Sequence, residues 1–159
     1  MDFLDRDQYN RKISKLNTDS NVQDSDLEEL TTLYDNLFCK LSDYEEIVML
    51  INICIAEDRK NNLEVLYDRY SKVKKMIDIH GDYGIEDYDS ILYCMGVFSF
   101  KFHDYKAAIG YFSKCEEQIL NKFSDPYQSG IYVKVKILMS YSMEYEGYLK
   151  EGPERAINI

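Results

Sequence analysis

The chain has 159 residues, of which 45% are hydrophobic and 30% charged, so it can build the core of one domain or two small ones and is not intrinsically disordered. Its formal net charge of −10 repels phosphate backbones and anionic lipids. The charge therefore disfavours nucleic-acid and membrane binding and favours a basic partner surface, although it would also serve solubility alone. Seven glycines and two prolines are too few for the turns of a sheet-rich fold, so we predict an all-α protein.

The location is predicted to be cytoplasmic. The first five residues lack the basic start and apolar core of a signal peptide. The longest apolar run, residues 47–56, is about half of the roughly 20 residues that cross a bilayer. Four cysteines lie in apolar helical stretches without Cys-x-x-Cys spacing, and we expect them to be small buried residues of a reducing compartment. They are Cys39, Cys54, Cys94 and Cys115.

Two capping-box sequences predict helix starts in the first half of the chain. Ser25 with Glu28, and Ser42 with Glu45, have the spacing at which the two side chains satisfy backbone N–H groups of a helix N-terminus. After Ser25, apolar residues recur at spacings of three and four, which is typical of an amphipathic helix. They are Leu27, Leu30, Tyr34, Leu37 and Leu41.

A small helical bundle is predicted for residues 1–79. It begins with a short amphipathic helix at residues 6–16 and a polar loop at 17–23. The helix that starts at Ser42 is apolar around nearly its whole circumference, so other elements must enclose it. A fourth helix is predicted for residues 61–79. Its apolar stripe is Leu63, Leu66, Tyr70, Val73 and Ile77.

Residues 80–87 contain two glycines among acidic residues and are predicted to be a linker. Two helices, 88–101 and 105–123, should then form a hairpin with a short turn. A further helix is predicted for 126–149, with Pro126 in its first turn. A last helix begins at residue 153, so residues 88–159 read as an incomplete array of helical hairpins.

Small and aromatic residues in the hairpin follow the pattern of a tetratricopeptide repeat. Gly96 and Ala108, 12 residues apart, would let the helices approach closely, while Phe112 fills the groove and Cys115 closes the contact. Ser99 stands where an aromatic residue is usual. A plain hairpin with small residues at its crossing is the alternative interpretation.

The residues that would begin the next repeat match the tetratricopeptide pattern less well than the first hairpin does. Ala156 follows Ala108 by 48 residues, which is longer than the usual period of about 34. We therefore expect an irregular array whose exposed stacking face is covered by a second copy in a homodimer, or by further chain.

The order of an acidic bundle, a linker and a repeat built on Gly96 and the string KFHDYKAAIGYFSKCEEQI resembles the bacterial Rap family. This family comprises peptide-regulated response-regulator aspartate phosphatases and their non-phosphatase relatives. The resemblance covers most of this chain but only the N-terminal part of a typical member. It implies that the bundle binds a response regulator and that the repeats bind a short regulatory peptide. Such proteins act in quorum sensing, in the control of sporulation or competence.

The resemblance also implies where a phosphatase would carry its catalytic glutamine, near the start of the third helix. Glu45 stands at that position, and no glutamine occurs anywhere in residues 39–60. A carboxylate would repel the phosphoryl oxygens, and Glu45 has a structural role available as the capping partner of Ser42. Glu45 is therefore only a weak catalytic candidate, and an enzyme is the less favoured interpretation.

The partner-binding candidates are Asp43, Tyr44, Glu45 and Glu46, at the start of the third helix. His80 and His103 are far apart and lack neighbouring ligands, so neither a metal site nor a cofactor is expected. Our leading hypothesis is a non-catalytic Rap-like regulator that inhibits a response regulator by occupancy. The alternatives are an aspartyl-phosphate phosphatase, and a tetratricopeptide scaffold or peptide-binding module.

Fifteen tyrosines are many for this length, and tyrosine is favoured at binding surfaces. We expect Tyr34, Tyr70 and Tyr111 to be buried because they lie on apolar helix faces. Four others are better candidates for a surface. They are Tyr83, Tyr88, Tyr127 and Tyr132.

Overall fold

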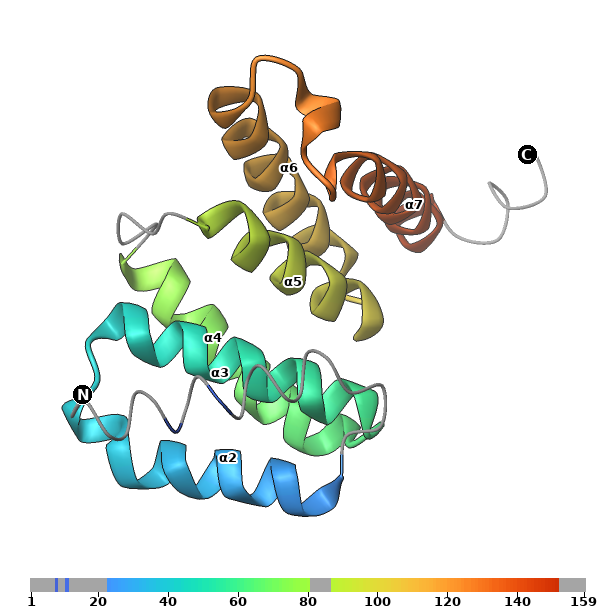
Figure 1. Ribbon diagram of the computed structural model, residues 1–159. Helices are drawn as coiled ribbons and strands as arrows, with labels where there is room; N and C mark the ends of the chain where they lie inside the picture. The colour runs from blue at the N-terminus through green and yellow to red at the C-terminus, as the bar shows by residue number, and fades with distance from the viewer. Residues whose placement is uncertain (1–7, 9–10, 12–22, 81–86, 152–159) are drawn as a thin grey trace. The chain divides into compact units, whose positions relative to one another are not determined.

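The computed structural model describes residues 8, 11, 23–80 and 87–151, and over these residues it is all-helical, as predicted (Figure 1). The chain divides into two compact units, residues 1–83 and 84–159. The division falls within the segment 80–87 that the sequence predicts as a linker. Several predictions lie mostly or wholly outside the described residues, namely the helix at 6–16, the loop at 17–23, Tyr83, the glycine turn and the helix from 153.

The described residues of the first unit form three helices and a short 3₁₀ turn. They are α2 (Asp24–Leu37), the turn η1 (Phe38–Lys40), α3 (Asp43–Arg59) and α4 (Leu63–His80). Both α2 and α4 pack against α3 (Figure 1). The prediction that α3 is enclosed on most sides is confirmed, because its buried residues cover more than half of the helix circumference. They are Ile47, Met49, Leu50, Ile51, Ile53, Cys54, Ala56 and Glu57.

The two predicted capping boxes have different outcomes. At α3 the box is formed, since the Ser42 hydroxyl accepts from the Glu45 amide and the Glu45 carboxylate accepts from the Ser42 amide. The box at Ser25 is wrong. Helix α2 begins one residue earlier, and the carbonyl of Gln23 accepts the first helical hydrogen bonds from Asp26 and Leu27. Ser25 is thus already inside the helix, where it cannot serve as its cap.

The start of α4 also differs from the prediction. Asn61 has a φ of 58°, a left-handed conformation that ends the preceding turn and that asparagine tolerates better than most residues. The helix therefore starts at Leu63, whose side chain is 43% exposed instead of buried. The remaining members of the predicted α4 stripe are buried, namely Leu66, Tyr70, Val73 and Ile77.

Within residues 87–151, the second unit forms a helical hairpin and a third helix. Its elements are α5 (Tyr88–Lys101), α6 (Tyr105–Lys122), the 3₁₀ turn η2 (Pro126–Gln128) and α7 (Tyr132–Glu151). Helix α6 packs against both α5 and α7 (Figure 1). The predicted start of a helix at Pro126 is wrong, because Pro126 begins η2, which Asp125 caps, and α7 begins six residues later.

The turn between α5 and α6 depends on two adjacent residues. His103 has a φ of 61°, which reverses the chain direction within a few residues. The carboxylate of Asp104 then accepts from the Ala107 amide at 3.2 Å and caps α6. The turn is therefore as short as the sequence predicts.

Helices α5 and α6 approach each other closely where a glycine of α5 contacts an aromatic ring of α6. Gly96 lies against Phe112, and a Cβ atom added to the glycine would come within 2.5 Å of that ring. Ala108, Phe112 and Cys115 are fully buried, and the Cys115 thiol donates to the Asp89 carbonyl at 3.1 Å. The structure thus places all four packing residues in the core of the hairpin.

Ser99 is compatible with this core although it replaces a usual aromatic residue. It is fully buried, and its hydroxyl donates to the Met95 carbonyl one turn earlier at 2.7 Å. The hydroxyl is therefore satisfied within its own helix. Leu120, near the end of α6, is by contrast exposed.

We predict that Gly96→Ala destabilises the protein by about 2 kcal/mol, because the fully buried Phe112 ring has no free space into which to move. Gly110→Ala is the matched control. An added Cβ at Gly110 meets nothing within 4 Å, and alanine favours a helix over glycine by about 1 kcal/mol. Urea unfolding of both variants measures the difference. Equal effects of the two substitutions would contradict this packing.

The cysteines differ from the prediction in their burial. Cys54 and Cys115 are buried as expected, whereas Cys39 is exposed in η1 and Cys94 is half-buried. Cys39 is exposed because the chain leaves the regular helix after Leu37. Burial raises the pKa of the Cys94 thiol to about 11 and that of Cys115 to about 12.

These raised pKa values predict a loss of stability at alkaline pH. Because the folded protein holds the thiol protons more tightly than the unfolded chain, the contribution is complete below the ordinary thiol pKa of 9.0 and declines as pH rises towards about 11 and 12. Urea unfolding at a series of pH values should show a smaller alkaline decline for Cys115→Ala than for wild type.

Candidate functional site

The first turn of α3 contains the four partner-binding candidates, and the structure gives them different roles. Asp43 and Tyr44 are exposed to solvent. Glu45 is half-buried, with its Oε1 3.3 Å from the Ser42 amide and 3.2 Å from the Ser42 hydroxyl. Glu45 therefore stabilises the helix N-terminus, and its carboxylate also has a favourable interaction with the helix dipole.

Glu46 points towards the other helices of the bundle. Its Oε1 accepts from the Tyr34 hydroxyl at 2.8 Å and forms an ion pair with Lys72 at 2.9 Å. Lys72 also donates to the oxygen of the same hydroxyl. A phenol can donate one hydrogen bond and accept another, so all three contacts form together. This Tyr34–Glu46–Lys72 cluster joins α2, α3 and α4.

Two cations lie over the ring of Tyr34. The Arg69 guanidinium carbon is 5.4 Å and the Lys72 ammonium 5.2 Å from the ring centroid. Both distances are within the range of a cation–π interaction. Tyr34 is buried, and both cations that contact its ring belong to α4. Tyr34 therefore links α2 to α4 as well as to α3.

The surroundings of Tyr34 and Lys72 favour the protonated form of each. Burial raises the pKa of the Tyr34 phenol, and the carboxylate of Glu46 adds to this rise against the opposing effect of Lys72. For Lys72, burial alone would lower the pKa, but the hydrogen bonds with Tyr34 and Glu46 outweigh it and raise the pKa. The neutral phenol, the charged ammonium and the carboxylate together form a structural link between the three helices.

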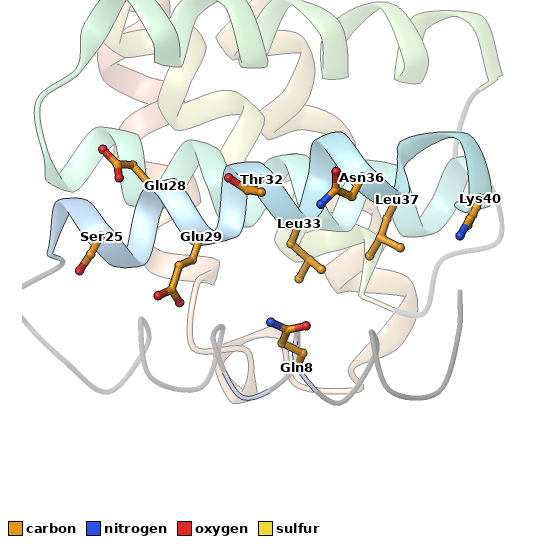
Figure 2. Close-up of a pocket in the computed structure, with 9 residues that line it drawn as sticks. All are labelled: Gln8, Ser25, Glu28, Glu29, Thr32, Leu33, Asn36, Leu37 and Lys40. Carbon is orange, nitrogen blue, oxygen red and sulfur yellow. The ribbon is translucent and has the colours of Figure 1, made fainter.

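A groove of about 640 Å³ runs along the outer face of α2 (Figure 2). Leu33 and Leu37 form its apolar floor, and Gln8 faces them from the opposite side (Figure 2). Polar side chains make up the rest of the lining. They are Ser25, Glu28, Glu29, Thr32, Asn36 and Lys40. The predicted apolar stripe does not contain Leu33, although Leu33 lies three residues after Leu30 and helical spacing could therefore have placed it there.

The two histidines occupy separate places in the chain. His80 is the last residue of α4, so its predicted position in the linker is wrong. His103 lies in the turn after α5, with its Nδ1 2.7 Å from the Tyr105 hydroxyl. Among the residues that the structure describes, no group of three or more histidine, cysteine or acidic side chains could hold a metal ion.

The tyrosine predictions are correct for the core and mixed for the surface. Tyr34, Tyr70 and Tyr111 are buried, and Tyr127 is exposed. Tyr88 is also buried, which contradicts its prediction as a surface residue, because the first turn of α5 lies in the core. Tyr132 is half-buried and forms an edge contact with Tyr127.

Comparisons with protein-family models, with curated proteins and with solved structures found no match to the chain. Within the described ranges, no helix is long and apolar enough to span a membrane.

We predict that Tyr34→Phe lowers the free energy of unfolding by about 1 kcal/mol, because it removes the hydroxyl between Glu46 and Lys72 and leaves the buried ring in place. Tyr44→Phe is the matched control, since Tyr44 is exposed and its substitution should change stability by less than about 0.5 kcal/mol. Chemical denaturation measures both. A stability of Tyr34→Phe equal to that of the control would show that the cluster does not hold the bundle together.

Proposed function

We propose that this protein is a non-catalytic regulator of the Rap type, which binds a response regulator through its first unit and inhibits it by occupancy. The proposal rests on the resemblance to the Rap family. Two features support that resemblance, namely the order of a helical bundle followed by a helical hairpin, and the sequence of residues 101–119. The described helices supply a three-helix body in residues 24–80 and a separate hairpin unit from Tyr88 onwards. This organisation is compatible with one unit for the regulator and another for a peptide.

The proposal that the protein is not catalytic rests on one observation. Both glutamates at the start of α3 are engaged in contacts that stabilise the fold. Glu45 is bonded to Ser42, and Glu46 is bonded to Tyr34 and Lys72. A phosphatase of this family would need a neutral amide here to hold a water in line with the phosphorus, and residues 39–60 contain no glutamine. The carboxylates would also repel a phosphoryl group. These facts favour binding over dephosphorylation.

The exposed part of the first turn of α3 suits a partner surface. Tyr44 offers a large side chain with a polar end, of the kind that is enriched at interfaces. Asp43 beside it adds negative charge to a chain that already has a net charge of −10, so a basic patch on the partner would be attracted. In this proposal Glu45 and Glu46 position the turn, while Asp43 and Tyr44 contact the regulator.

The second unit would bind the short regulatory peptide. Its hairpin and α7 form the described part of the array, and peptide binding there would control release of the regulator, as the family resemblance implies. The location of both events would be the cytoplasm, where response regulators act.

The direct test is a binding assay of the full chain with each response regulator of its host. We expect at least one of them to bind, and we expect Asp43→Ala combined with Tyr44→Ala to weaken that binding about tenfold or more. Tyr127→Ala is the control, because it removes an equally large exposed tyrosine from the second unit. Circular dichroism should show that all variants keep their helices.

Two results would overturn the proposal. One is the absence of binding to any of the regulators. The other is faster loss of phosphate from a phosphorylated regulator that Glu45→Ala abolishes, which would identify a phosphatase instead. Retention of phosphate together with binding is the outcome that we expect.

A further inference from the structure

A second pocket of the first unit lies where α2 meets the end of α3 and the turn that follows it. Its volume is about 520 Å³, and side chains of α2, α3 and the α3–α4 turn line it. Leu27 is a buried apolar side chain of its wall, and Thr31 contributes a hydroxyl one helical turn further on. Asp24 and Glu28 also line the pocket and are exposed to solvent. The wall therefore combines one apolar side chain with several hydrogen-bond acceptors.

Glu57, in the last turn of α3, contributes a buried carboxylate to this pocket. Only 4% of the residue is exposed to solvent. Its Oε2 accepts from the side-chain amide of Asn62 at 2.8 Å, and the backbone amide of Asn62 donates to the Glu57 carbonyl at 3.0 Å. Oε1 has no hydrogen-bond donor among the residues that the structure describes. The turn thus holds the carboxylate in place and leaves one of its oxygens for a group in the pocket.

Glu57 also has no cationic partner within the described part of the chain. Lys60, three residues later, forms its ion pair with Asp24 at 2.7 Å instead. A carboxylate that is taken out of water loses hydration, which a cation or several hydrogen bonds must replace. One neutral amide replaces it only in part. The pocket therefore has a fixed negative charge that a cationic ligand would balance, and Glu28 adds to the negative potential there.

We propose that this pocket binds the guanidinium group of an arginine side chain, presented by a basic segment of a partner. A guanidinium has five N–H donors in a planar fork, so it can donate to Oε1 of Glu57 and to the Thr31 hydroxyl together. The methylene groups of the same side chain would contact Leu27. The formal net charge of −10 attracts a basic segment over longer distances.

Two other kinds of cation fit the pocket less well. A metal ion needs several ligands around one point, and over the described ranges no group of three or more histidine, cysteine or acidic side chains could hold one. A lysine ammonium is a compact charge that is strongly hydrated, so its transfer to a buried carboxylate is costly. A guanidinium is more weakly hydrated and can lie flat against an apolar wall, which is why arginine is the occupant.

Titration of the full chain with N-acetyl-arginine amide tests the proposal, with the methyl NMR signals of Leu27 and Thr31 as the readout. These signals should shift and saturate, whereas the citrulline counterpart, in which a neutral urea replaces the guanidinium, should leave them unchanged. Glu57→Gln keeps an oxygen for Asn62 but removes the charge, and it should weaken binding about tenfold or more. Glu117→Gln is the matched control, since it removes the same charge from an exposed position of α6 and should bind as wild type does.

Urea unfolding separates binding from a structural role of the carboxylate. Because Glu57→Gln removes a buried charge without a cationic partner, the variant should be at least as stable as wild type when arginine is absent. Asp43→Ala combined with Tyr44→Ala changes the opposite end of α3 and should leave arginine binding unchanged. Failure of the proposed regulator binding would therefore not affect this proposal.

Three results would overturn the arginine pocket. One is the absence of a saturable shift at Leu27 and Thr31 when the arginine amide is added. Another is equal binding of the lysine or citrulline counterpart, because the pocket would then not recognise a guanidinium. The third is a Glu57→Gln variant that binds as tightly as wild type or is much less stable, which would assign the carboxylate to the α3–α4 turn alone.

Discussion

The apolar circumference of α3 is the constraint on which the first unit depends. Ile47, Met49 and Leu50 are buried on different sides of the helix, and burial of each such side chain stabilises the fold by about 1 to 3 kcal/mol. No single neighbour can cover a helix on all sides, so α2 and α4 both pack against it. The hydrogen bonds and ion pair of Tyr34, Glu46 and Lys72 then select one arrangement of the three helices. Apolar burial thus supplies the stability, and the polar cluster supplies the specificity.

The same arrangement limits what the first turn of α3 can do. Glu45 caps the start of α3, and Glu46 binds Lys72 of α4. Only Asp43, the third acidic residue of this turn, is directed to solvent. Asp43 and Tyr44 remain available for a partner. A binding role that depends on a rigid helix N-terminus is compatible with this division. Acid–base chemistry, which needs a carboxylate free to move a proton, is not favoured by it.

Local signals in the sequence predicted the elements well, and contacts between distant residues could not be predicted. The capping box at Ser42 and the helix α4 are confirmed predictions. Both patterns involve residues that are only a few positions apart in the sequence. The link between Tyr34 and Lys72 spans 38 residues, and the sequence contains no signal for it. The failures at Ser25, Leu63 and Pro126 occurred at helix ends, where backbone conformations such as the positive φ of Asn61 decide the boundary.

Hydrogen–deuterium exchange of the full chain, with and without a bound response regulator, tests the central claim most directly. The account predicts that the regulator protects backbone amides in the first turn of α3, around Asp43 and Tyr44, where the helix leaves its first N–H groups without intrahelical partners. Amides in the hairpin of α5 and α6 should keep their exchange rates. Protection confined to the hairpin, with no change at the start of α3, would contradict the account.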